Sequence, residues 1–167
     1  MPEARFVVQL TPAPALTPTG DDEIDFLFTA NGNFAPQKVE RIASGGEISR
    51  VMLALKALLA HRMELPTIIF DEIDTGVSGK IAEKMAMIME DMGAGGRQVI
   101  SITHLPQIAS RGLHHYKVEK TDTPEGTESH MRQLSADERV GEIAMMLSGE
   151  NVTEAALENA RALLSTH

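Results

Sequence analysis

The sequence predicts an α/β fold in which parallel strands with flanking helices are combined with antiparallel strands. Two short apolar runs, Thr67–Asp71 and Arg97–Ile102, are typical of buried parallel strands. An amphipathic segment separates them, and a strand, a helix and a strand at this spacing form a βαβ crossover with adjacent parallel strands. Runs of strand-forming residues joined by turn residues in both terminal regions add the antiparallel part.

The N-terminal region is predicted to form an antiparallel pair of strands. Arg5–Leu10 and Ile24–Ala30 are rich in β-forming residues. Between them, Thr11–Gly20 is rich in proline and closes with glycine, so we expect a loop there. Asn31–Asn33, with the sequence NGN, should turn the chain after the second strand.

Two longer helices are predicted from apolar residues at three- and four-residue steps, which place them on one helix face. The first helix should begin at Ser44 and run to about His61; its apolar positions are Ile48, Val51, Met52, Leu55, Leu58 and Leu59. The second lies between the two apolar runs and stops at the glycines of residues 93–96; its positions are Ile81, Met85, Ile88, Met89 and Met92. We expect the methionine-rich faces to pack in the core.

The C-terminal region should hold a hairpin between helices. LPQIAS, after His104, predicts a short helix, and HHYKVEK and ESHMRQL flank the turn TDTPEGT. Ser135 and Glu138 have the spacing of a capping box, which predicts a helix that ends near Gly149. A last helix follows Thr153, and residues 1–167 as a whole are expected to form one domain.

Composition excludes several classes of protein. The 167 residues are 43% hydrophobic, which is enough to fold around a core, and no cysteine is present. There is no signal peptide and no apolar run near the roughly 20 residues of a membrane span, so we expect a cytoplasmic protein. The formal net charge of −9, with few aromatic residues, argues against DNA binding by this chain alone.

The segment GVSGK, residues 76–80, looks like the end of a phosphate-binding loop. Such a loop needs a glycine five positions before its Gly-Lys pair and a serine or threonine after it. Those positions hold Asp74 and Ile81, and neither an aspartate nor an isoleucine can replace the residue required. We therefore reject a phosphate-binding loop here, and no other stretch supplies one.

Acidic residues follow the first predicted parallel strand. Asp71 and Glu72 end an apolar strand, which is where open α/β sheets place ligands. An aspartate there can hold Mg²⁺, and a neighbouring glutamate can accept a proton from an attacking water. The parallel neighbour strand runs into His104, so this histidine should leave the same edge and could contact a phosphate. The alternative is a pair of solvated acids beside an ordinary surface histidine.

The start of the first long helix carries an unusual pair of glycines. Ser44, Gly45, Gly46 and Glu47 fit a capping box on spacing alone. A cap needs no glycines in the first turn, where they weaken the helix. Glycines there allow a ligand to approach bare N–H groups, which indicates an anion site.

Together these motifs resemble the ABC-type ATPase head. Residues 43–47 are similar to its signature motif, 68–72 to Walker B, 73–78 to the D-loop, and His104 to the switch histidine. More narrowly, IASGGEISRVMLALK, IIFDEIDTGVSG and ITHLPQIA resemble the RecN family of bacterial SMC-like repair proteins. The resemblance spans residues 5–164. It implies the C-terminal lobe of a P-loop-type head, preceded in a longer chain by a Walker A part and a coiled coil.

The resemblance also implies roles for the site residues. Asp71 would position Mg²⁺, usually through water, Glu72 would be the general base, and His104 would contact the γ-phosphate of ATP. Further residues would act across a pair of heads, namely Ser44, Gly45 and Gly46 on the γ-phosphate held by the second head, and Asp74 in the D-loop. The implied partners are the N-terminal head portion, a second head in a homodimer, and DNA bound by the full assembly near the nucleoid.

Two other functions stay open on the residues alone. One is a self-contained metal-dependent phosphoesterase that uses Asp71, Glu72, Asp74 and His104, because a loop could turn Asp71 and Asp74 onto one ion. It leaves the two glycines at the helix start unexplained. The other is a non-catalytic interaction domain with a merely solvated acidic loop.

Overall fold

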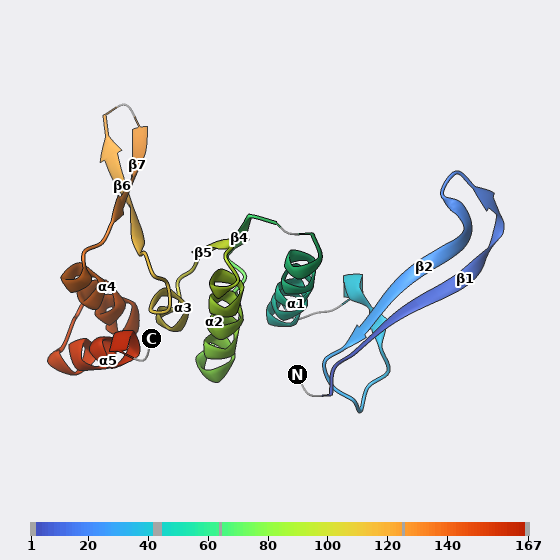
Figure 1. Ribbon diagram of the computed structural model, residues 1–167, viewed down its shortest axis with the longest axis horizontal. Helices are drawn as coiled ribbons and strands as arrows, with labels where there is room; N and C mark the ends of the chain where they lie inside the picture. The colour runs from blue at the N-terminus through green and yellow to red at the C-terminus, as the bar shows by residue number, and fades with distance from the viewer. Residues whose placement is uncertain (1–2, 42–44, 64, 125, 166–167) are drawn as a thin grey trace.

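The computed structural model describes residues 3–41, 45–63, 65–124 and 126–165. The elements follow one another along the long axis nearly in chain order, with a long hairpin at one end and a helix pair at the other (Figure 1). The chain exposes 11608 Å², whereas a compact monomer of this mass exposes roughly 8,000 Å². A large part of the molecule is therefore left uncovered by the chain itself.

An antiparallel sheet forms the N-terminal end. It has the order β1-β2-β3, with β1 at Arg5–Thr17, β2 at Gly20–Thr29 and β3 at Gln37–Lys38. A short 3₁₀ helix, η1 (Val39–Arg41), follows. The predicted antiparallel pairing of the first two strands is confirmed, and β3 and η1 were not predicted.

The predicted loop at Thr11–Gly20 is wrong for most of its length. Strand β1 continues to Thr17, and Pro12 lies opposite Asp22 in the register before an irregularity. Because β1 is an edge strand, a residue without an N–H can stand on its outer side without breaking a ladder bond. The prolines mark an edge strand here and not a loop.

The central unit is the predicted βαβ crossover. Strand β4 (Thr67–Asp71) pairs in parallel with β5 (Gln98–Ile102), and helix α2 (Gly79–Ala94) connects them. Helix α2 packs on one face of the sheet, where Ile68 and Phe70 are buried. The methionines of α2 that pack in this core, as predicted, are Met85, Met89 and Met92.

The opposite face of the β4–β5 sheet is bare among the described residues. Side chains alternate between faces along a strand, and the three isoleucines of the second face, Ile69, Ile100 and Ile102, are 54%, 40% and 52% exposed. Parallel sheets are normally covered on both faces. We refer to Ile69, Ile100 and Ile102 as the bare face below.

Helix α1 (Gly45–Met63) forms where the periodicity predicts a helix, but its predicted apolar face is not in the core. The α1 residues that are buried are Leu53 and Ala60. The predicted stripe is largely exposed, and Leu58 reaches 65%. Helical spacing predicts the stripe correctly, but the described residues supply no surface that covers it.

The C-terminal region matches its prediction closely. A short helix α3 (Pro106–Ala109) precedes the antiparallel hairpin of β6 (Tyr116–Thr123) and β7 (Gly126–Gln133). The strands extend further into the expected turn than predicted. Helices α4 (Ala136–Ser148) and α5 (Glu154–Ser165) then pack on each other. Nowhere in these described ranges is a helix both long and apolar enough to cross a membrane.

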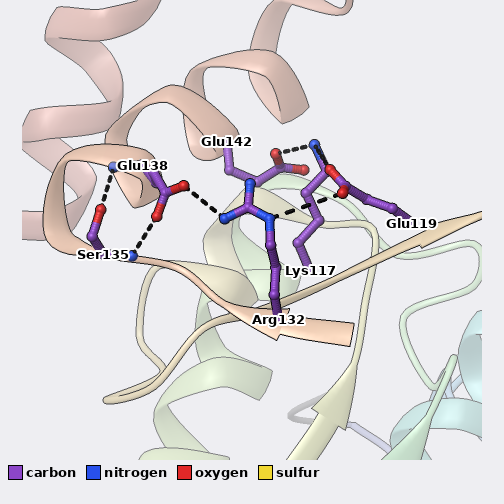
Figure 2. A network of polar contacts seen from close by, with 6 residues as sticks. All are labelled: Lys117, Glu119, Arg132, Ser135, Glu138 and Glu142. Atoms are coloured by element: carbon purple, nitrogen blue, oxygen red, sulfur yellow. Dashed lines mark hydrogen bonds and ion pairs between the residues drawn. The ribbon is translucent and has the colours of Figure 1, made fainter. Parts of the chain in front are cut away.

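A network of charges ties the hairpin to α4 (Figure 2). Lys117 of β6 bonds Glu142 at 2.7 Å, and Arg132 of β7 bonds Glu138 at 2.6 Å. The predicted capping box is present in both directions, between Ser135 and Glu138. Hydrogen bonds from Ser135 and then Arg132 lower the pKa of Glu138 to about 2, and the bond to Glu142 raises the pKa of Lys117.

Candidate functional site

The carboxyl ends of β4 and β5 meet at one edge of the parallel sheet. Asp71 lies opposite Ile102 in the register. The pairing continues past both strands through one more bond, from the Glu72 N–H to the Ile102 carbonyl, at 3.2 Å. Thr103 and His104 follow directly on β5. The prediction that Glu72 and His104 leave the sheet at the same edge is confirmed.

Glu72 has an unusual backbone conformation. Its φ is 45°, which is the left-handed region that side-chain-bearing residues seldom adopt. The carbonyl of Glu72 accepts hydrogen bonds from the N–H and the hydroxyl of Thr75, at 3.3 and 3.0 Å. This turn holds a conformation that costs about 1 to 3 kcal/mol. The left-handed turn therefore lies just where the strand ends, and the Glu72 side chain there is exposed.

Asp71 is exposed at the end of β4 and shares the bare face with Ile69, because the two are two positions apart on the strand. A single exposed carboxylate fits Mg²⁺, which is usually held by one or two carboxylates together with phosphate oxygens and waters. Across the described ranges, no group of three or more His, Asp or Glu is arranged to hold a metal ion. The remaining ligands of such an ion would have to come from elsewhere.

Asp74 is turned inward, with 1% of its surface exposed. Its Oδ2 accepts hydrogen bonds from the Thr103 hydroxyl and from the His104 N–H, the latter at 3.2 Å. The same oxygen lies 3.4 Å from His104 Nδ1. The carboxylate therefore joins the turn after β4 to the residues after β5. It does not point toward Asp71, so the two-carboxylate metal site of the phosphoesterase hypothesis has no support.

The two glycines at the start of α1 differ in their surroundings. A Cβ on Gly46 would lie 2.8 Å from the carbonyl oxygen of Gly76, so only glycine allows these two backbones to meet. Packing against Gly76 thus explains why residue 46 is a glycine, and the anion-site interpretation did not include this reason. Gly45 faces open space as far as the described residues go, since none of their atoms lies within 4 Å of its Cβ position. The third predicted residue of this group, Ser44, lies outside the described residues.

The contact between Gly46 and Gly76 brings the start of α1 beside the turn that follows β4. Further along α1, Lys56 donates to the carbonyl of Ile69 at 3.0 Å, and its Nζ lies 5.1 Å from the centre of the Phe70 ring. A hydrogen bond and a cation–π contact thus hold α1 along β4. The helix start, the acidic strand end and His104 form one continuous edge.

The contacts of three residues near this edge were not predicted from the sequence. Thr103 and Gly76 hold the loops together, and Lys56 anchors the helix. Thr103 stands directly before His104 at the end of a predicted strand. From this position the sequence could have suggested that its hydroxyl supports the histidine. Sequence spacing alone carries no information on the contacts of Gly76 and Lys56, because these depend on how α1 packs against the loop and strand.

The chain was compared with known proteins, and no protein-family model matches it. Curated relatives named DNA repair protein RecN match nearly all of it. The protein of Rickettsia felis is 41% identical over 164 residues, which cover 98% of this chain and 30% of the relative. The protein of Deinococcus radiodurans is 44% identical over 165 residues, which cover 99% and 28%. The chain thus spans about three tenths of the length of these relatives.

Solved structures that share this fold include SMC head domains. The Smc head domain with a coiled coil and joint from Pyrococcus yayanosii has a TM-score of 0.64 at 19% identity, covering 85% of this chain and 26% of that chain. A structure from work on ATP-driven dimerization and DNA-stimulated activation of SMC ATPases has a TM-score of 0.61 at 18% identity, covering 89% and 83%. The predicted α/β class, with the architecture of an SMC-type head, is confirmed. Over nearly its whole length the chain is therefore RecN-like in sequence, and its fold is that of an SMC head domain.

Proposed function

We propose that this chain is the C-terminal portion of the ATPase head of a RecN-like protein, and that the head drives repair of DNA double-strand breaks. The relatives that match nearly all of the chain are named DNA repair protein RecN. The shared fold with SMC head domains supports an ATP-hydrolysing head. No observation favours the phosphoesterase or the non-catalytic interaction domain.

The observation that carries this proposal is the parallel register that brings Asp71, Glu72 and His104 to one edge of the sheet. In the proposed mechanism, Glu72 accepts a proton from the water that attacks the γ-phosphate. His104 would contact that phosphate, and Asp71 would help to hold Mg²⁺, whose charge would offset that of the phosphates. The exposure of all three side chains supports their access to a nucleotide.

The first proposed partner is the N-terminal portion of the same head, which would bring the phosphate-binding loop. The isoleucines of the bare face and the apolar stripe of α1 support a partner that covers both. Exposed apolar surface of this extent marks an interface. The area in excess of a compact monomer, roughly 3,500 Å² on this chain, is large enough for one side of an obligate interface, which buries about 2,000 to 5,000 Å² or more over both partners.

The second proposed partner is another head of the same kind. Ser44, Gly45 and Gly46 would contact the γ-phosphate of ATP held by that head, and the open space in front of Gly45 supports such an approach. Asp74 belongs to the D-loop-like turn beside them. Two ATP molecules would be held between the two heads, and hydrolysis would release the pair.

DNA would be bound by the full assembly and not by this portion alone, because the chain carries a formal net charge of −9. The bacterial RecN relatives support action in the cytoplasm, at the nucleoid. We further propose that this portion alone does not hydrolyse ATP, since no stretch of it supplies the loop that holds the phosphates.

The test is Glu72→Gln in the longer protein, with Glu83→Gln on α2 as a matched control at an exposed glutamate. Loss of the general base should lower ATP turnover roughly 100- to 10,000-fold while ATP binding survives, so ATP-bound head pairs should accumulate. Turnover and size in the presence of ATP are measured together. Unchanged turnover, or no ATP-dependent pairing, would refute the proposal; Glu83→Gln should behave as the unaltered protein.

A further inference from the structure

The Asp74 carboxylate is buried between two loops that the proposed mechanism uses separately. Its Oδ2 receives the Thr103 hydroxyl and the His104 N–H, and the Thr103 oxygen in turn accepts the Leu105 N–H at 3.0 Å. The chain of bonds therefore runs from the turn after β4 into the start of the segment that carries α3. The other carboxylate oxygen, Oδ1, is buried with no hydrogen-bond partner among the described residues.

We propose that Asp74 is the positioning residue for His104, and that it sets both the place and the tautomer of this histidine; the inference rests on the proposed function. Burying a carboxylate costs free energy unless it is hydrogen-bonded. An aspartate with no role at this position would therefore be expected to remain in solvent. Among the described residues, the partners of the Asp74 carboxylate are Thr103 and His104.

The geometry acts on His104 in two ways. The bonds to the Thr103 hydroxyl and the His104 N–H fix the backbone at the point where β5 ends. The Nδ1 atom faces the carboxylate at 3.4 Å, which favours the proton on Nδ1. The opposite nitrogen, Nε2, then carries a lone pair, so it would meet the phosphate through a bridging water that donates to it. The His104 side chain itself stays 66% exposed, so without Asp74 it would be free to choose other rotamers.

The position of Asp74 also links His104 to the other parts of the edge. Asp74 and Gly76 belong to one turn, whose ends are fixed by the Thr75 bonds to Glu72 and by the Val77 N–H bond to the Asp74 carbonyl at 3.0 Å. The same turn meets Gly46 at the start of α1. The carboxylate therefore holds His104 in register with Glu72 and with the helix start.

The test is a double-mutant cycle in the longer protein, with Asp74→Ala, His104→Ala and both together. Misplacing His104 should lower the kcat for ATP roughly 10- to 100-fold and leave the Kd for ATP unchanged. In the His104→Ala background, Asp74→Ala should add no further loss, because its effect passes through the histidine. An equal loss in both backgrounds, or no loss in either, would overturn the proposal.

Two further variants keep the test decisive. If Asp74→Ala fails to fold, Asp74→Asn has nearly the same shape and should show the same non-additivity with a smaller loss. Asp122→Asn is the matched control, because Asp122 also accepts a threonine hydroxyl, from Thr127 at 2.8 Å, but lies in the exposed hairpin. It should leave kcat unchanged, and a loss equal to that of Asp74→Asn would overturn the assignment.

A readout independent of turnover separates this inference from the proposed function. In protein labelled with ¹⁵N-histidine, the ring nitrogen shifts report the tautomer of His104. The Nδ1–H form should dominate and should give way to a mixture in Asp74→Ala. An unchanged tautomer refutes the positioning role. If His104→Ala leaves ATP turnover intact while the tautomer does depend on Asp74, the proposed role of His104 fails and the positioning role stands.

Discussion

The two faces of the β4–β5 sheet are made of similar residues but have different surroundings. On one face, Ile68 is 6% exposed under α2; on the other, its neighbour Ile69 is 54% exposed. The covered face provides the core of this chain, and the bare face ends in Asp71. The residues of β4 that stabilise the fold therefore alternate with residues on the face that leads to the proposed ATP site.

The C-terminal helices α4 and α5 differ from the bare face because they form a core with each other. Their core residues Ile143, Ala144 and Ala160 are 0% exposed, the α4 start is capped, and charges tie it to the hairpin (Figure 2). These residues are buried within this chain, mainly by the contact between α4 and α5. Changes there should affect stability alike in this chain and in the longer protein.

The largest predicted effect comes from Ile68→Ala and Ile69→Ala, a matched pair on opposite faces. In this chain alone, Ile68→Ala should lower the free energy of unfolding by about 2 to 5 kcal/mol, whereas Ile69→Ala should change it by about 0.5 kcal/mol or less. In the longer protein both should be costly, because the proposed N-terminal head portion would cover Ile69. Urea unfolding measures each value. Equal costs in this chain alone would show that the bare face is covered within it.

The next effect concerns the two glycines at the start of α1. Gly46→Ala places a methyl group 2.8 Å from the Gly76 oxygen, and overpacking of this kind costs about 1 to 3 kcal/mol. Gly45→Ala meets open space and should be neutral or stabilising by up to about 1 kcal/mol, since alanine favours helix. Thermal unfolding distinguishes the two. If both variants are equally destabilised, the contact between Gly46 and Gly76 is not what requires glycine.

A smaller effect should follow from loss of the α4 cap. Ser135→Ala removes the side chain that accepts the Glu138 N–H and should lower the free energy of unfolding by about 0.5 to 2 kcal/mol. The cost should be the same in this chain and in the longer protein, because the cap lies in the self-contained region. Ser165→Ala in the last turn of α5 is the control and should have little effect. If Ser135→Ala lowered the free energy of unfolding in the longer protein alone, the α4 cap would not act within this region by itself, and the comparison between the two regions would be wrong.

The smallest effect is a dependence of stability on acid. The pKa of Glu138 is lowered from 4.5 to about 2 in the folded chain, so its contribution is fully present above pH 4.5 and is lost as the pH falls toward 2. Glu138→Gln should remove this part of the acid dependence. Unfolding measured from pH 5 to pH 2 tests it, and an unchanged pH dependence in the variant would contradict the assignment.

The sequence predicts the site well where neighbours along the chain decide the outcome. The apolar runs ending at Asp71 and Ile102, with a helix between them, imply the parallel pair and hence the shared edge of Glu72 and His104. The Ser135–Glu138 box likewise depends on a three-residue spacing. In both cases the structure is determined by residues close together in the sequence, so a local pattern is enough to predict it.

Prediction fails where a contact between distant segments decides. The proline-rich stretch after Leu10 becomes strand because β1 lies at an edge, a fact that depends on the whole sheet. The stripe of α1 has helical spacing, but only tertiary structure determines that Leu53, and not Leu58, is buried. The contact of the Asp74 side chain with Thr103 was also not predicted, because it depends on how the two loops meet.

The most direct test of the central claim is ATP turnover by this chain alone and by the longer protein under the same conditions. If the chain supplies the general base while another portion holds the phosphates, the chain alone should be inactive. The longer protein should hydrolyse ATP and lose that activity with Glu72→Gln. Turnover by this chain alone at the rate of the longer protein would contradict the claim.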